Sequence, residues 1–278
     1  LLALHVAGKW KPPAELATDA LERVLQTSSG DDPPSSTFSH DVSTLLDILA
    51  GSKEVDESRI ARLEWAFLPL LGRYERKPKL LHRELARNPS FFAEILALVF
   101  RAEGEERREA SEEEQARAQR GYELLTSWRT VPGTADDGTL AADALKAWVR
   151  RARETAAKNG RGAVGDSMIG QVLSASPMGA DGTWPHLAVS DVIEEVMSTD
   201  LEHGFEMGVH NSRGTVCKGL TEGGSQEHQL AEQYAGSAVA IGDRWPRTAA
   251  TLRRIADSYR AQARSEDQEA ELREAIGL

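Results

Sequence analysis

The chain has 278 residues and a formal net charge of −11 at pH 7. This length allows one large domain or two small ones, with a substantial buried core. Nucleic-acid-binding proteins usually carry a basic excess or a basic stripe, and the sequence contains neither, so we expect no nucleic-acid partner. Because no apolar run approaches the ~20 residues that span a bilayer, we expect no membrane partner either.

The sequence contains a single cysteine, Cys217, which cannot form an intramolecular disulfide. A single cysteine in a chain of this length is typical of a reducing compartment, so we predict a cytoplasmic protein. The first residues lack the basic segment of a signal peptide, do not begin with methionine and have the pattern of an apolar helix. We therefore interpret the chain as a piece of a longer polypeptide.

Apolar residues recur at the i, i+3, i+4, i+7 spacing of an amphipathic helix along almost the whole chain. Alternating patterns typical of β-strands are nearly absent, so the sequence predicts an all-α protein with about a dozen helices. The same spacing predicts that Trp65, Phe67, Phe92 and Trp148 lie in the core. The clearest apolar faces, in chain order, are Ile60/Leu63/Phe67/Leu70, Phe92/Ile95/Leu96/Val99, Leu140/Ala144/Leu145/Trp148/Ala152, Val189/Val192/Ile193/Val196 and Leu252/Ile255/Ala256/Tyr259/Ala263.

Turn-forming residues separate the expected helices. Ser, Asp, Gly and Pro dominate the stretch around residues 27–40, which we interpret as a flexible linker. Asn88 is followed by a proline and has the pattern of an N-cap, and Pro246 is expected to open the last long helix in the same way. We expect Pro69 to kink or end its helix, and Thr139 to cap the helix that follows it.

The spacing of these breaks predicts an N-terminal helical region over residues 1–130 and a C-terminal helical region over 138–278, or one continuous domain. Helix pairs joined by short loops favour an irregular α-solenoid of the HEAT or tetratricopeptide type. No strict period of about 34 or 40 residues is found, so a compact helical bundle is the alternative. Fourteen of the 23 glycines lie between residues 160 and 242, which predicts Gly-rich loops or close backbone approach there.

The sequence has no strong signature of catalysis or of nucleotide binding. Gly160 to Gly165 match G-x-G-x-x-G, but a dinucleotide site needs a preceding strand, so we interpret the motif as a helix C-cap and loop. Ser167 does not lie in a nucleophile elbow, and Asp166 or Ser167 is expected to cap the next helix. Sequence proximity to histidines does not give Cys217 a base in contact with its thiol. We predict no catalytic residue, no cofactor and no bound metal.

The stretch 184–228 contains the residues that we expect to contact a ligand or partner. His203, Glu206 and His210 fall within about 60° of one another on a helix, opposite an apolar stripe. Two imidazoles and a carboxylate on one stripe could ligate a divalent metal or contact a partner, and they are also what a solvated helix face presents. His203 and its two neighbours are therefore candidate contact residues with these three interpretations open.

Three further residues of this stretch are candidate contact residues. Trp184 lies in a predicted loop, where a large aromatic side chain either staples the next helix or forms a contact site. Arg213 follows Asn211 and Ser212 in another predicted loop, where a guanidinium could meet a carboxylate or phosphate. His186 follows Trp184 closely and can donate, accept or ligate. The candidate contact set is Trp184, His186, His203, Glu206, His210 and Arg213.

Three stretches resemble the helical C-terminal part of large, poorly characterised bacterial multidomain proteins. The stretches read LEWAFLPLL over residues 63–71, LHRELA over 81–86 with PSFF over 89–92, and WPRTA over 245–249 with LRRIA over 252–256. Some of these proteins are associated with toxin–antitoxin or anti-phage modules, so the resemblance implies a bacterial cytosolic sensor or scaffold region. It carries no functional residue over to this chain.

These patterns lead us to predict a non-catalytic helical interaction or sensor module of a larger bacterial protein. Its partner is expected to be another protein or another domain of the same polypeptide, because extended helical surfaces are suited to binding polypeptides. The alternative is an enzyme, or a domain that binds a small ligand or metal, with its site in the 184–228 stretch. An interaction module predicts an extended groove, whereas the alternative predicts a deep pocket lined by the candidate residues.

We expect this chain to show no specific binding to duplex DNA at physiological salt, because its charge of −11 repels the phosphate backbone. The measurement is fluorescence anisotropy of labelled duplexes titrated with the chain at several salt concentrations. A nanomolar complex whose affinity falls steeply with added salt would contradict this expectation.

Overall fold

The computed structural model describes residues 12–27, 36–71, 77–106, 108–135, 137–214, 218–219 and 222–275. These residues form twelve α-helices and no β-strand, apart from one isolated antiparallel bridge between Thr134 and Leu140. The predicted all-α fold with about a dozen helices is therefore confirmed. Cys217 lies outside the described residues.

The chain divides into two compact units. Among the described residues, unit 1 takes those up to Val99 together with Glu106–Trp128, and unit 2 takes Phe100–Glu105 and Arg129 onwards. The main division between Trp128 and Arg129 lies just before the predicted boundary region at 130–138. The short Phe100–Glu105 segment belongs to unit 2. Here the backbone N–H of Glu103 donates to the carbonyl oxygen of Gly160, and Nε of Arg161 donates to the carbonyl oxygen of Phe100.

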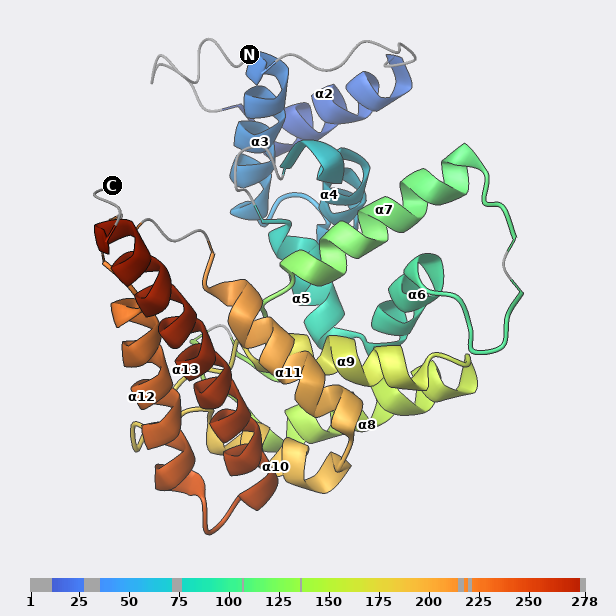
Figure 1. Cartoon of the computed structure of the whole chain (residues 1–278). Coiled ribbons are helices and arrows are strands. Elements are labelled where there is room, and N and C mark those ends of the chain that lie inside the picture. The colour runs from blue at the N-terminus through green and yellow to red at the C-terminus, as the bar shows by residue number, and fades with distance from the viewer. Residues whose placement is uncertain are drawn as a thin grey trace. The chain divides into compact units, whose positions relative to one another are not determined.

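Unit 1 is a bundle built around the α4 helix, which contacts α2, α3, α5 and α7 (Figure 1). Contacts between helices that are distant in the chain, such as α4 with α7, favour a closed bundle and not the stacking of sequential pairs that defines a solenoid. The helices of unit 1 are α2 (Ala14–Thr27), α3 (Ser36–Ala50), α4 (Glu57–Leu71), α5 (Lys79–Arg87), α6 (Pro89–Val99) and α7 (Glu112–Ser127).

A buried carboxylate joins α4 to α5 in unit 1. Glu64 is fully buried, and its Oε2 accepts hydrogen bonds from the backbone N–H groups of Leu80 at 2.9 Å and Leu81 at 3.0 Å. These groups belong to the first turn of α5, where backbone N–H groups have no partner within the helix. The negative charge also lies at the positive end of the helix dipole. Glu64 therefore fixes where α5 begins relative to α4.

The sequence signals for helix ends in unit 1 are mostly confirmed. Asn88 caps α6, because its Oδ1 accepts from the backbone N–H groups of Ser90 at 3.1 Å and Phe91 at 3.3 Å. Pro69 lies inside α4, and the helix ends two residues later. The linker predicted around 27–40 is too long at both ends, since Thr27 ends α2 and the residues from Ser36 onwards form α3. The rest of that linker lies outside the described residues.

Unit 2 is a second bundle, in which the neighbouring helices α12 and α13 run side by side and α11 crosses α9 (Figure 1). Helix α8 packs on α9 and α10, and α13 packs on α10 and α11. The helices of unit 2 are α8 (Ala142–Lys158), α9 (Gly162–Leu173), α10 (Leu187–Val196), α11 (Thr199–Ser212), α12 (Ser225–Ile241) and α13 (Pro246–Ala275). As predicted, a proline opens the last long helix.

Glycines make the crossing of α9 and α11 unusually close. A Cβ atom added at Gly170 would lie 2.7 Å from the backbone N of Phe205, and one added at Gly204 would lie 2.8 Å from Cα of Ser167. A Cβ atom at Gly208 would lie 2.7 Å from the carbonyl oxygen of Gln171. The predicted close approach of backbones is therefore found at these three glycines. The prediction of Gly-rich loops is wrong for them, because they lie inside helices.

Two helix starts in unit 2 differ from the predictions. Helix α8 begins after Ala141, while the hydroxyl of Thr139 donates to Asp137 in the preceding turn and caps no helix. Helix α9 begins at Gly162, so Asp166 and Ser167 lie inside it and do not cap it. Only Gly160 of the G-x-G-x-x-G motif follows the predicted pattern, because its φ of +64° places it just beyond the end of α8.

The predicted core residues are buried with one exception. Phe67, Phe92 and Trp148 are buried, with exposed fractions of 4%, 0% and 5%. Trp65 is only half-buried. It lies on the flank of the apolar face of α4, next to Glu64, and it lines a groove between α4, α5 and α6. The prediction that Trp65 is a core residue is therefore wrong.

Gly204→Ala is expected to lower the free energy of unfolding by about 3 kcal/mol, because the new methyl group meets backbone and not a flexible side chain. The matched control is Gly236→Ala in α12, where no atom lies within 4 Å of the added Cβ. That change should stabilise the chain by about 0.5–1 kcal/mol through helix propensity. Urea denaturation followed by circular dichroism measures both, and equal effects of the two variants would contradict the close crossing.

Candidate functional site

The structure brings two of the six candidate contact residues, Trp184 and His210, into one aromatic cluster in unit 2, and a third borders it. We define the aromatic cluster as Trp184, Phe205, His210, Tyr234 and Tyr259. The Trp184 ring lies 5.6 Å from Phe205 and 5.5 Å from Tyr234, and the Tyr234 ring stacks on Tyr259 at 5.7 Å. The His210 ring lies 4.9 Å from Tyr259. The cluster joins the loop before α10 to helices α11, α12 and α13.

Arg213, the third candidate residue at this place, borders the aromatic cluster. It ends α11, and its guanidinium lies over the Tyr259 ring at 5.7 Å. Its charge is met by Glu227, which is fully buried at the start of α12 and also pairs with Lys218. Lys218 pairs in addition with Glu266 of α13. The guanidinium therefore meets a carboxylate, as the sequence indicated, but the carboxylate belongs to the chain itself.

Burial and pairing act in opposite directions on Glu227. Burial by itself raises the pKa of a carboxyl group, but hydrogen bonds from Lys218 and Arg213 outweigh it and hold the pKa of Glu227 below its usual value. Sequence reasoning missed this residue. Glu227 shares a helix face with the buried Ala231 and Ala238, and a carboxylate on an otherwise apolar face is the signal that indicates a buried ion pair.

Trp184 and His186 have structural contacts in the loop before α10. The indole N–H of Trp184 donates to the carbonyl oxygen of Ser176 at 3.0 Å. Nδ1 of His186 accepts from the backbone N–H of Ala188 at 3.1 Å, so the imidazole is the N-cap of α10. The Trp184 ring therefore packs on α11 and α12 through Phe205 and Tyr234, and His186 provides the contact to α10.

The imidazole of His210 is half-buried against Tyr259. Burial lowers the pKa of His210, the neighbouring Glu206 opposes this shift, and the positive charge of Arg213 adds to it. The lowered pKa favours the neutral imidazole, which packs on the Tyr259 ring. Burial, together with the nearby Tyr259, also raises the pKa of Tyr234 to about 12, so its phenol stays protonated.

The predicted stripe of His203, Glu206 and His210 exists on α11, but its three side chains have different surroundings. His203 is exposed, whereas Glu206 accepts from Nε of Arg254 at 2.6 Å. Arg254 also donates to the buried Glu202 at 3.0 Å. Within the described residues, no group of three or more His, Cys, Asp or Glu side chains is placed to hold a metal ion. The stripe instead ties α11 to α13.

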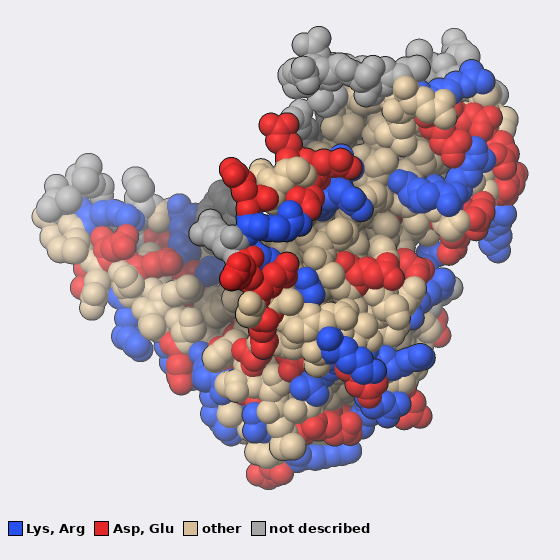
Figure 2. Space-filling view, turned by 90° about the vertical axis from the view of Figure 1, so that its right-hand side faces the viewer, with Lys and Arg blue, Asp and Glu red and all other residues tan. Residues whose placement is uncertain are grey.

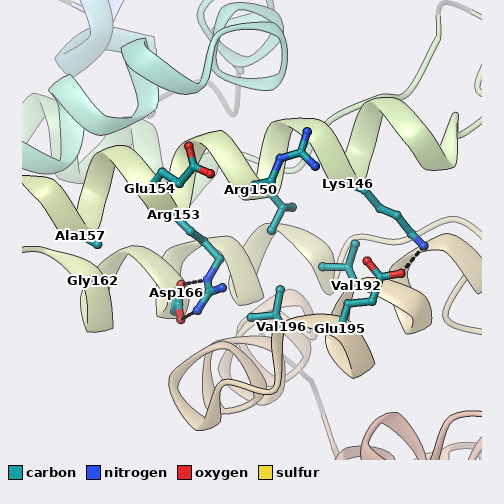
Figure 3. A pocket seen from close by; sticks show the side chains of 11 residues that line it. Lys146, Arg150, Arg153, Glu154, Ala157, Gly162, Asp166, Val192, Glu195 and Val196 are labelled. Atoms are coloured by element: carbon teal, nitrogen blue, oxygen red, sulfur yellow. Dashed lines mark hydrogen bonds and ion pairs between the residues drawn. The ribbon is translucent and has the colours of Figure 1, made fainter.

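A groove of about 540 Å³ lies elsewhere on unit 2, between α8, α9 and α10, and we call it the α8 groove (Figure 3). Val149 and Val192 are buried in its floor and Val196 is half-buried. None of its lining side chains carries a hydroxyl, a thiol or an imidazole, and its polar groups are ammonium, guanidinium and carboxylate groups. The residues that line it are Lys146, Val149, Arg150, Arg153, Glu154, Ala157, Gly162, Asp166, Val192, Glu195 and Val196.

Two ion-pair bridges cross the α8 groove between its walls (Figure 3). Nε and Nη2 of Arg153 donate to the two oxygens of Asp166 at 2.7 and 3.0 Å, which joins α8 to α9. Lys146 pairs with Glu195, and with Asp191 at 3.4 Å, which joins α8 to α10. These bridges hold the three helices at a fixed separation around the valine floor.

Arg150 and Glu154 lie one turn apart on α8 and point away from α9 and α10 in Figure 3. Both are exposed, and neither makes an ion pair with the residues that the structure describes. They provide one free charge of each sign at the upper edge of the groove. On the face drawn in Figure 2, acidic and basic side chains are likewise interspersed, with no broad basic surface among the residues described there.

Sequence reasoning did not identify the α8 groove. The spacing of Lys146, Arg150 and Arg153 in the sequence places these three cations near one another on α8. Its opposite walls come from Asp166 and Glu195, which lie in other helices. Nothing in the local pattern of α8 indicates which carboxylates meet these cations or that a hollow remains between them.

Glu227→Gln is expected to lower the free energy of unfolding at pH 7 by about 2–3 kcal/mol, because Arg213 and Lys218 lose their shared buried partner. The folded-state pKa of Glu227 lies below its ordinary value of 4.5, so its contribution is present above that value and is lost as the pH falls through the folded pKa. The difference from wild type should therefore shrink below about pH 4.5.

The control for Glu227→Gln is Glu232→Gln, whose side chain is 80% exposed. This change should alter stability by less than about 0.5 kcal/mol at every pH. Urea denaturation at pH 4 to 8 measures both variants. Equal stability of Glu227→Gln and wild type at pH 7 would contradict the buried ion pair.

Comparisons with protein-family models, with curated proteins and with solved structures found no match to this chain. Among the described helices, none is both long and apolar enough to cross a membrane. The resemblance to helical regions of bacterial multidomain proteins stays a prediction. A proposal about function therefore rests on the geometry of the two units.

Proposed function

We propose that this chain is a non-catalytic helical interaction module that binds a segment of a protein partner, or of another domain of its own polypeptide, in the α8 groove. The observation that carries the proposal is the composition of this groove. A floor of valines lies between rims that carry three cationic and three anionic side chains. An amphipathic polypeptide segment has matching features, with apolar side chains on one face and charges of both signs beside them.

The charges of the α8 groove favour a polypeptide over a small ion. Arg153 and Lys146 are already neutralised by carboxylates of α9 and α10, so the groove has little net field to attract an isolated anion or cation. The unpaired Arg150 and Glu154 supply directional contacts at the rim. Arginine is enriched in protein interfaces, where it combines an apolar stem with several donors.

The rigidity of the walls supports binding without rearrangement. Asp191 of α10 accepts a hydrogen bond from the indole N–H of Trp245 at 2.8 Å and also forms an ion pair with Lys146. Glu194, three residues later, accepts the backbone N–H of Thr248 at 2.8 Å. Helix α10 is thus fixed to α13 on one side and α8 on the other. A preformed groove loses little conformational entropy on binding.

No observation favours the alternative of an enzyme or metal site in the 184–228 stretch. Two of the described polar side chains there, Arg213 and Glu206, are engaged in ion pairs within unit 2, with Glu227 and Arg254. A reacting site needs groups that are free to meet a substrate. We extend the proposal to a bacterial cytosolic protein, as the resemblance of the three helical stretches implies.

The test uses the full-length polypeptide in its own cells, with a photo-crosslinking amino acid in place of Ala157. This residue is exposed at the edge of the α8 groove. Mass spectrometry should map the crosslinks to one continuous segment of a protein. Arg150→Glu should lower their yield about fivefold, since a rim charge is reversed, whereas Arg151→Glu, on an exposed residue outside the groove, should not.

The background is measured with the photo-crosslinking amino acid at Val239 of α12, which is 79% exposed. Crosslinks from position 157 that spread over as many proteins as those from position 239 would overturn the proposal. So would a single crosslinked segment whose yield is the same in Arg150→Glu and Arg151→Glu. A segment within the same polypeptide and a segment of a second protein both support the module, and the crosslink itself distinguishes them.

A further inference from the structure

A second groove, of about 660 Å³, lies on unit 1 between α4, α5 and α6, and we call it the Trp65 groove. Leu80, Leu81 and Ile95 are buried in its floor, with exposed fractions of 5%, 4% and 3%. Trp65 and Phe91 line it and are half-buried, so each presents part of its ring to the groove. The lining is therefore more apolar and more aromatic than that of the α8 groove.

The walls of the Trp65 groove are set by two polar contacts at helix starts. Glu64 accepts the backbone N–H groups of Leu80 and Leu81 and so fixes α5 against α4. Asn88 caps α6 through its contact with Phe91 and so fixes the position from which the Phe91 ring extends. These contacts fix the helices from which the half-buried rings of Trp65 and Phe91 extend.

The carboxylates that line the groove are occupied by neighbours within unit 1. Glu57 lies 2.9 Å from Nη1 of Arg83 and 3.8 Å from Nη1 of Arg87. Glu84 accepts from Nδ2 of Asn88 at 3.0 Å. These contacts leave Glu57 and Glu84 with reduced capacity to attract a further cation.

Asp56 is also engaged, because it precedes α4 and accepts from Ser58. The hydroxyl and backbone N–H of Ser58 hold the pKa of Asp56 below its usual value. Arg62, in contrast, lines the groove, is exposed and makes no ion pair within 4 Å with the described residues. It lies one turn before Trp65 on α4. The charge at the mouth of this groove that has no ion-pair partner is therefore positive and adjoins an aromatic ring. Arg62 also attracts Asp56 over a longer distance and helps to lower its pKa.

We propose that the Trp65 groove binds a peptide segment that presents a large apolar side chain within one helical turn of a carboxylate. The apolar side chain fills the floor between Trp65 and Phe91, and the carboxylate pairs with Arg62. Tryptophan and arginine are the residues that most often dominate binding energy in protein interfaces, especially beside a desolvated pocket. This second site lies in a different unit from the α8 groove and does not depend on the function proposed there.

The same residues are less suited to a nucleic acid. Aromatic rings and arginines can stack on bases, but Asp56, Glu57 and Glu84 also line the groove and would repel the phosphates next to a stacked base. A peptide carboxylate meets Arg62 at one point and needs no path past these acids. A single-stranded oligonucleotide therefore serves as a competitor in the test.

The probe is a phage-displayed library of random 16-residue peptides selected on the whole chain. Enriched peptides are expected to carry Leu, Ile, Phe or Trp within four positions of Asp or Glu. Synthetic copies should lose about tenfold in affinity on Arg62→Glu and at least tenfold on Trp65→Ala. The matched controls, Arg117→Glu and Tyr122→Ala on the exposed face of α7, should bind like wild type.

Several outcomes would overturn the inference. Enriched peptides with Lys or Arg in place of the acids would do so, as would equal affinity for Arg62→Glu and Arg117→Glu. Displacement of the peptides by a single-stranded oligonucleotide at micromolar concentration would assign the groove to nucleic acid instead. Because Trp65→Ala removes a half-buried ring, its circular dichroism melt is recorded, and the exposed Arg62→Glu variant decides the result if that melt is lowered.

Discussion

The close crossing of α9 and α11 is the contact on which most of unit 2 depends. Gly170, Gly204 and Gly208 let the two backbones touch, and any side chain at these positions would push the helices apart. Helix α9 carries the Asp166 carboxylate to Arg153 and so forms one wall of the α8 groove. Helix α11 carries Phe205 into the aromatic cluster. Separating the two helices would disturb the groove and the cluster together.

Buried carboxylates connect one helix to another in both units. Glu64 caps α5 from α4, Glu202 joins α11 to α13 through Arg247 and Arg254, and Glu227 joins α12 to the end of α11 through Arg213. Each carboxylate loses hydration on burial and regains hydrogen bonds only when its partners stand in the right place. Such contacts favour one arrangement of helices over the many that apolar packing alone would allow.

Each unit also contains a groove whose chemistry differs from that of the other. The α8 groove has a valine floor, bridges of paired charges and one free charge of each sign, which suits a polypeptide with mixed charges. The Trp65 groove has two aromatic rings and a guanidinium with no ion-pair partner among the described residues, which suits an acidic and apolar segment. In both grooves, ion pairs and caps fix the walls, so the sites exist before a ligand arrives.

The sequence by itself determined the helical class, the apolar faces and several helix starts, because these depend on residues within one or two turns. Asn88 before Pro89 and the proline that opens α13 are examples. It also placed Trp184, His210 and Arg213 in one region of the chain, but it did not show what their side chains contact. Their packing and pairing with Tyr259 and Glu227, the opening beside Trp65 and both grooves were decided only by the tertiary structure. The physical reason is that each of these features is made by side chains from two or more different helices, and local periodicity does not encode which of them meet.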